Sequence, residues 1–220
     1  MQKFLVTLAV VCGISPLLSA NTISDGTFAG WALSSFGNGS MTLEAANGNP
    51  GARLNATTTT GLDLTFVYDN AIDSNVTITG ALSGSFSLSL DVLSGANDFG
   101  AGQAIGLLVQ QGGDIYLQFL ANTGFPQNTF TTLNFNGTFV AASFSHLVGT
   151  GVAAPDFSGG TSSLFGFSAY NRTANRTLTK YYDNFNLTYT SAAVPEPSTW
   201  LLFGCAAGGL FLFRKLSAAN

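Results

Sequence analysis

The residues that could carry acid–base or nucleophilic chemistry are few in this chain. His146 is the only histidine, so a zinc site built from several histidines is excluded and a Ser-His-Asp triad would depend on this one residue. No serine lies in a Gly-x-Ser-x-Gly turn, and Gly100-Ala101-Gly102 lacks the third glycine of a nucleotide-binding loop. We therefore expect neither acyl nor nucleotide chemistry, and we interpret His146 as an ordinary strand or loop residue.

Glycoside hydrolysis needs two carboxyl groups on opposite sides of a sugar bond. Glu44 is the only glutamate between residues 21 and 193, and the closest aspartate pair is Asp69 and Asp73. Because this pair flanks Asn70-Ala71, we interpret it as two caps of a turn. The sequence predicts no catalytic residue, and a hydrolase using Glu44 or the aspartate pair stays as an alternative.

The charge balance bears on the partners. Between residues 21 and 193, four basic residues stand against ten acidic ones, a net charge of −6. Such a surface is a poor match for nucleic acid. Both cysteines, Cys12 and Cys205, lie in apolar terminal segments, so the body between them has no disulfide to stabilise it.

The N-terminus has the features of an export signal. Lys3 supplies a positive charge, residues 4–14 form an apolar run, and Pro16 precedes the small residues Ser19 and Ala20. This order is typical of a signal peptide, and we predict cleavage after Ala20. We therefore expect the Sec translocon to export the chain.

The C-terminus combines a short motif, an apolar segment and a basic end. Two prolines one residue apart prevent regular helix or strand pairing, so the motif should be extended and accessible. The apolar segment 200–213 is short for a membrane helix, but Trp200 at one interface and the basic pair at the other would relieve part of the mismatch. The motif residues are Val194, Pro195, Glu196, Pro197, Ser198 and Thr199, and the basic pair is Arg214 and Lys215.

This ordered set resembles the PEP-CTERM sorting domain, also named the ice-binding protein C-terminal domain, of exported proteins in Gram-negative bacteria. The resemblance covers residues 194–220, although its usual basic end is a longer arginine cluster. It implies recognition of Pro195-Glu196-Pro197 by an exosortase, a membrane protease. It also implies transient anchoring in the inner membrane and delivery to the cell surface or exterior. We do not predict ice binding, because the only threonine tract is Thr57 to Thr60.

Apolar and polar residues alternate repeatedly between residues 62 and 190, which predicts strands with one face in water. Gly112-Gly113 and Asn136-Gly137 tolerate the positive φ of tight turns, so we predict a hairpin at each. The predicted strands are 62–68, 76–82, 86–92, 104–110, 114–120, 131–135, 138–144, 163–170 and 178–190.

Nine or ten short strands without helices predict an all-β fold, an antiparallel two-sheet sandwich of jelly-roll type. The predicted organisation is a signal peptide (1–20), a β-sandwich body (21–190), a linker with the motif (191–199), a single transmembrane helix (200–213) and a cytoplasmic basic end (214–220).

The body also resembles carbohydrate-binding jelly rolls, through Asp25-Gly26-Thr27-Phe28 with Gly30-Trp31 and through Tyr182-Asp183-Asn184-Phe185. The resemblance implies a structural Ca²⁺ held by oxygen ligands of Asp25 and Asp183. Sugar binding requires exposed aromatic rings. The ring candidates are Trp31, Tyr116, Tyr170, Tyr181 and Tyr182.

The sequence therefore predicts an exported, non-enzymatic surface or extracellular-matrix protein whose body associates with polysaccharide. One alternative is a structural matrix protein that self-associates through sheet edges and binds no sugar. The other is the carbohydrate-active hydrolase considered above.

Overall fold

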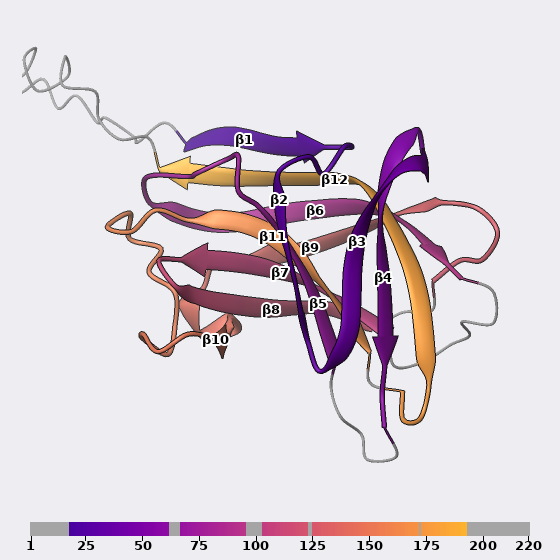
Figure 1. Cartoon of the computed structure of the whole chain (residues 1–220). Coiled ribbons are helices and arrows are strands. Elements are labelled where there is room, and N and C mark those ends of the chain that lie inside the picture. Colours follow the sequence, from indigo (N-terminus) through magenta and orange to yellow (C-terminus); the bar gives the residue numbers. More distant parts are fainter. Residues whose placement is uncertain (1–17, 62–66, 96–102, 123–124, 172, 193–220) are drawn as a thin grey trace, which may run out of the picture. The chain divides into compact units, whose positions relative to one another are not determined.

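The computed structural model describes residues 18–61, 67–95, 103–122, 125–171 and 173–192, and residues 19–192 form one compact unit. Two six-stranded sheets make up this unit (Figure 1). Every strand pair with an assigned register is antiparallel. The predicted all-β, two-sheet sandwich is confirmed and fits the jelly-roll type.

The first sheet, sheet A, has the strand order β3-β4-β12-β6-β9, and β1 also pairs with β12. The long strand β12 is central because it pairs with β4 over its first half and with β6 over most of its length. The strands are β1 (Leu18–Asp25), β3 (Asn38–Gly48), β4 (Gly51–Thr59), β6 (Leu82–Ser94), β9 (Thr131–Thr138) and β12 (Thr177–Ala192).

The second sheet, sheet B, has the order β10-β8-β7-β11-β5-β2. One 3-10 turn, Ala141–Ser143, precedes β10. The strands are β2 (Trp31–Phe36), β5 (Val67–Asp73), β7 (Gln103–Gln111), β8 (Asp114–Asn122), β10 (Ser145–Val148) and β11 (Leu164–Asn171).

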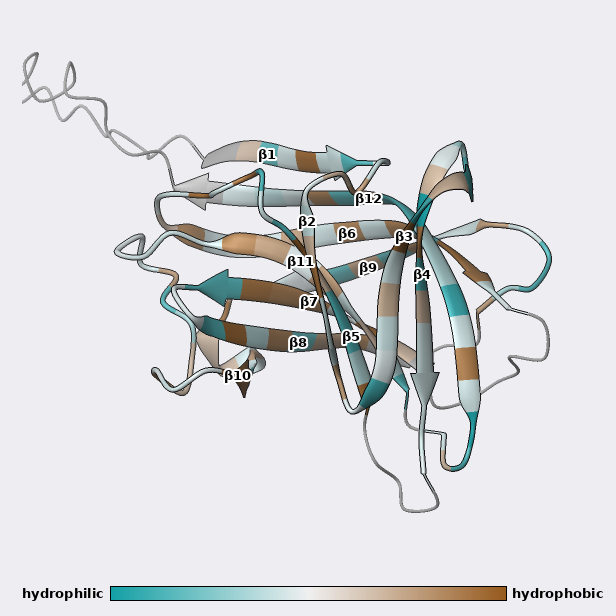
Figure 2. Ribbon diagram, in the orientation of Figure 1, coloured by the Kyte–Doolittle hydropathy of each residue, from teal (hydrophilic) through white to brown (hydrophobic). Residues whose placement is uncertain are grey.

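The core lies between the two sheets and follows from the alternation of the strands. In β6, Leu88 and Leu90 are fully buried, while in β11 Phe165 and Phe167 point to the same interior. Burial of each such side chain contributes about 1.5–3 kcal/mol. Figure 2 shows long hydrophobic stretches in β7 and β8.

One of the two predicted hairpin turns is confirmed and the other is wrong. Gly112 has φ +60° and joins β7 to β8. Asn136-Gly137, however, continues within β9, where Gly137 pairs with Phe86 of β6. A Cβ at Gly137 would collide with the Phe86 ring, so this glycine allows a close approach instead of making a turn.

The turn predicted at Asn70-Ala71 is also wrong, because Asp69 and Asp73 both lie in β5 and are buried. The sequence prediction missed strands β1 to β4. Their side chains are mostly Ser, Thr, Asn, Gly and Ala, which give only a weak alternation of hydrophobicity. The predicted strand 76–82 is reduced to an isolated bridge at Ile78, and residues 62–66 lie outside the described part.

The predicted export signal up to residue 17 and everything from residue 193 onward, including the motif and the basic pair, lie outside the described residues. Within the described ranges, no helix has the length and apolar character needed to cross a membrane. Ala20 lies exposed in β1.

Candidate functional site

The outer face of sheet B carries a row of four aromatic rings, which we call the aromatic row: Phe36, Tyr68, Tyr170 and Phe119. Strand register places Phe36 beside Tyr68, and Tyr68 beside Tyr170. The Tyr68 and Tyr170 ring centroids are 4.7 Å apart, and Phe119 meets Tyr170 edge-on at 6.1 Å. Phe119 is 48% exposed and Phe36 is 36% exposed, so the two ends of the row face solvent.

Strand alternation explains why these rings point away from the core. In β11, Phe165, Phe167 and Ala169 belong to the core cluster, so Tyr170 takes the opposite face. In β5, Ala71 points inward and Tyr68 outward by the same rule. The row crosses from β2 to β8, four strand spacings of about 4.8 Å, or about 19 Å.

Two polar side chains lie beside this row without hydrogen-bond partners. Asn70 pairs with Ser168 across β5 and β11, and both are fully buried. Neither the Asn70 amide oxygen, nor its amide nitrogen, nor the Ser168 hydroxyl makes a hydrogen bond. Each unsatisfied group costs about 1–3 kcal/mol. These groups lie on the same face as the exposed rings. A hydroxyl-bearing ligand bound there would supply the missing hydrogen bonds and relieve this cost.

The described strands present no charged residue on this face of sheet B. Neighbouring rows place small or apolar side chains around the rings, among them Gly106, which lies opposite Phe119. The outer-face residues of β2, β5, β7, β8 and β11 are Ala32, Ser34, Phe36, Tyr68, Asn70, Ile72, Ala104, Gly106, Leu108, Gln110, Ile115, Leu117, Phe119, Leu164, Gly166, Ser168 and Tyr170.

Trp31 and Tyr116, two of the five ring candidates, lie in the core, which corrects the prediction. Trp31 is 7% exposed and packs against Phe28 and Phe185, with ring centroids 5.0 and 5.1 Å away. Tyr116 is 1% exposed, and its hydroxyl donates to the carbonyl of Val152 at 3.1 Å. Their ring faces are covered by protein, so they are not available for stacking on a sugar.

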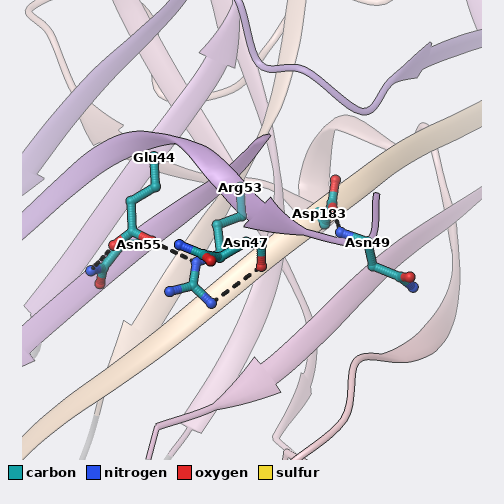
Figure 3. A network of polar contacts seen from close by, with 6 residues as sticks. All are labelled: Glu44, Asn47, Asn49, Arg53, Asn55 and Asp183. Carbon is teal, nitrogen blue, oxygen red and sulfur yellow. Dashed lines mark hydrogen bonds and ion pairs between the residues drawn. The ribbon is translucent and has the colours of Figure 1, made fainter. Parts of the chain in front are cut away.

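Tyr181, another of the five candidates, lies half-buried on the outer face of sheet A. The Arg53 guanidinium covers its ring at 3.7 Å from the centroid. Arg53 also pairs with Glu44 at 2.6 Å, and Glu44 accepts a hydrogen bond from Asn55 at 2.7 Å (Figure 3). The hydrogen bonds from Asn55 and Arg53 hold the pKa of Glu44 below its ordinary value. One ring face of Tyr181 is therefore occupied. Of the two remaining candidates, Tyr182 is fully buried, and Tyr170, a member of the aromatic row, is 9% exposed.

Asp25, one of the two predicted metal ligands, organises the first turn of the chain. One carboxylate oxygen accepts hydrogen bonds from the backbone and hydroxyl of Thr27, at 2.6 and 2.8 Å, and from the Phe28 backbone at 3.0 Å. The other accepts the indole N–H of Trp31 at 2.8 Å. Burial raises the pKa of Asp25, but these hydrogen bonds outweigh it and leave the pKa below its usual value.

Asp183, the other predicted ligand, meets a different acid, Asp91. The two residues are paired across β12 and β6, and both are buried. Burial raises the pKa of Asp183, hydrogen bonds from the backbone N–H groups of Asn49 and Asn184 lower it, and the charge of Asp91 raises it further. The Asn184 amide also donates to Asp91 at 2.8 Å. Gly26 lies beside Asp183 and Asn184, so the first turn and the last strand do meet.

This cluster has the oxygen-rich donor set that Ca²⁺ prefers: two carboxylates, two asparagine side chains and the carbonyl of Asn49. The residues therefore fit a hard cation in chemistry, although Asp25 is turned away toward Trp31. Among the described residues, no group of three or more His, Cys, Asp or Glu side chains is placed to hold a metal ion.

Glu44, Asp69 and Asp73, the acids of the hydrolase alternative, are held in separate contacts. Glu44 is held by Arg53 and Asn55, Asp69 points into the interior beside Gly39, and Asp73 accepts the backbone N–H of Asn75 at 2.8 Å. His146 lies in β10 with Nε2 3.0 Å from an oxygen of Asp114. These contacts agree with the interpretation of His146 as a strand residue.

Comparison with known proteins finds distant likeness to solved structures. No protein-family model matches the chain, and no curated protein shows a significant match. The family 11 carbohydrate-binding module of a Clostridium thermocellum cellulosomal cellulase is 15% identical, covering 77% of this chain and 95% of its own with a TM-score of 0.44. The CBM22-1 xylan-binding domain from Paenibacillus barcinonensis is 16% identical. The match covers 78% of this chain and 95% of that domain, with a TM-score of 0.46.

Proposed function

We propose that residues 19–192 form a non-enzymatic carbohydrate-binding module, which binds uncharged polysaccharide across the aromatic row of sheet B. The observation that carries the proposal is the pair Asn70 and Ser168, buried without hydrogen-bond partners beside the rings of Tyr68 and Tyr170. Aromatic faces pack against the C–H faces of sugar rings, and the amide and hydroxyl pair with sugar hydroxyls.

The charge of the module supports an uncharged ligand. The described residues on the outer face of sheet B include no cation, and the body as a whole carries a net charge of −6. An acidic polysaccharide would be repelled and would find no counter-charge, whereas a neutral one meets only rings, hydroxyls and amides.

A pull-down of the module tests this proposal. Residues 19–192 are mixed with insoluble or immobilised xylan, mixed-linkage β-glucan, galactan and dextran, with alginate as an acidic control. We expect retention on a neutral polymer, inhibition by its soluble oligosaccharide and at least tenfold weaker binding in Tyr68→Ala. Val152→Ala removes an exposed apolar side chain elsewhere and should change nothing.

Three outcomes contradict the proposal. Retention that a soluble sugar does not inhibit supports the structural, self-associating alternative. Release of sugar products supports the hydrolase alternative. Full binding in Tyr68→Ala removes the aromatic row from the site.

We further propose that the chain is exported, processed near Pro195-Glu196-Pro197 by an exosortase-type protease, and delivered to the cell surface or matrix. The ordered sequence of motif, apolar segment and Arg214-Lys215 supports this. Replacing the three motif residues with alanine should leave the full-length chain in the inner membrane. Unchanged release of a processed chain would reject it.

The Asp91–Asp183 cluster supports a third proposal, a structural Ca²⁺ that ties β12 to β6 and to the turn at Asn49. The charged residue that shifts the pKa of Asp183 is Asp91, and its negative charge repels that of Asp183. A divalent cation between the two carboxylates would relieve this repulsion. Its role would be structural, with no part in sugar chemistry.

A further inference from the structure

The outer face of sheet A carries a second surface that the proposed function does not use. Side chains of β6, β9 and β12 surround a hollow of about 330 Å³, which we call the polar hollow. Its rim consists of Ser85, Ser87, Asn136, Thr188 and Thr190. The volume lies within the ~300–1,000 Å³ typical of small-molecule sites.

Strand register builds this rim from residues far apart in sequence. Ser87 of β6 lies between Asn136 of β9 and Thr188 of β12. Thr188 in turn lies 3.3 Å, hydroxyl to hydroxyl, from Thr22 of β1. The hydroxyl and amide groups therefore form a continuous polar surface across four neighbouring strands.

The floor of the hollow is the strand backbone. Phe86 and Tyr189 belong to its lining, but their side chains are buried and their rings are directed to the core, so they reach the hollow with the main chain. The hollow thus offers a main-chain base surrounded by side chains that each donate and accept hydrogen bonds. No residue of its lining is charged.

This chemistry selects one class of ligand. A sugar carries hydroxyls that both donate and accept hydrogen bonds, which is the complement of the hydroxyl and amide groups of this rim. A charged ligand would leave its charge without a partner there. The small rim side chains leave room that longer ones would fill.

We propose that the polar hollow is a second carbohydrate subsite, so that one module holds two glycan segments on opposite faces of the sandwich. The proposal rests on the proposed function for its ligand class. Because the two sheets face one another through the core, their outer faces point in opposite directions (Figure 1). A single module then cross-links polysaccharide chains without self-association.

The experiment separates the two sites. Residues 19–192 labelled with ¹⁵N are titrated with xylohexaose, cellohexaose and galactotriose while backbone amides are followed by NMR. We expect saturable shifts in two groups, one around Tyr68 and Tyr170 and one around Ser87 and Thr188. Ser87→Trp, which fills the hollow, should abolish only the second group, and Tyr68→Ala only the first.

Ser89→Trp is the matched control, because Ser89 lies on the same strand and face outside the hollow. It should keep both groups of shifts. Asn136→Ala, on the edge strand β9, removes the amide donor and acceptor without adding bulk. It should weaken the binding that gives the second group of shifts at least fivefold, and it tests the site even if Ser87→Trp misfolds. In light scattering with a long polymer, the native module should cross-link and Ser87→Trp should only bind.

Two results would overturn the second site: no saturable shift near Ser87 with any of the three sugars, or unchanged shifts in both Ser87→Trp and Asn136→Ala. If the native module shows the shifts around Ser87 but none around Tyr68, the aromatic row is rejected as a binding site and the polar hollow is kept. If Ser87→Trp still cross-links the polymer, the cross-linking comes from association of modules and not from a second site.

Discussion

Asp69 should make the module less stable as the pH rises through the weakly acidic range. Its side chain is fully buried in β5, and neither carboxylate oxygen makes a hydrogen bond of normal geometry. Burial raises its pKa from 3.8 to about 6, while the nearby Ser35 hydroxyl and Lys180 ammonium offset only part of that effect. Asp69→Asn removes this titration and keeps the size of the side chain.

The magnitude follows from the difference between the two pKa values. In the unfolded chain the carboxyl loses its proton near pH 3.8, whereas in the folded chain it keeps the proton to about pH 6. The folded state therefore binds more protons between these values, and its stability falls as the pH rises through them. At ~1.36 kcal/mol per pKa unit, the loss is about 2 to 3 kcal/mol.

Urea denaturation of the native module and of Asp69→Asn at pH 3.5, 5, 6.5 and 8 measures this effect. The relevant quantity is the difference in unfolding free energy between the two proteins, because other titrations cancel in it. We expect this difference to move by about 2 to 3 kcal/mol in favour of Asp69→Asn between pH 3.5 and pH 8.

Asp156→Asn is the control, because hydrogen bonds from the Ser158 side chain and backbone lower the pKa of Asp156, so its effect has the opposite sign. A difference between native and Asp69→Asn that stays constant across the pH series would refute the reasoning. It would mean that Asp69 is ionised in the folded module at acidic pH.

Three further predictions follow from single contacts. Asp25→Ala should lower the unfolding free energy by about 2 kcal/mol in urea, because the first turn and the Trp31 indole lose their acceptor; an unchanged midpoint would contradict this. Gly137→Ala should cost about 1–3 kcal/mol, since its Cβ would collide with Phe86; equal stability would show that β9 moves freely. Millimolar Ca²⁺ should raise the melting temperature of the native module but not of Asp183→Asn, and an equal rise in both would reject the cation site.

The strands of the second half of the body were predictable because their apolar residues alternate strictly. In β6 and β12, large side chains alternate with Ser, Thr and Asn, so one face is marked as buried. The first four strands lack this contrast, since their buried residues include small ones such as Ala56 and Thr58. Their pairing depends on the neighbours that β12 and β5 provide.

The candidate sites show the same division between local and distant information. Phe36, Tyr68 and Phe119 come from three separate strands, and only the order β8-β7-β11-β5-β2 brings them onto one face with Tyr170. Asp91 meets Asp183 only because β6 pairs with β12. Trp31 and Tyr116, by contrast, have the right residue type for stacking but point inward, which the sequence signal did not reveal.

By itself the sequence determined the β-rich body, the scarcity of catalytic side chains and the acidic charge, and it predicts the export and sorting segments, because these depend on composition and on residues close together in the chain. Tertiary structure alone decided which rings remain exposed, which polar groups lie buried without partners and which carboxylates meet. The physical reason is that each of these depends on strand order and register, which bring together residues that can lie more than one hundred positions apart in the sequence.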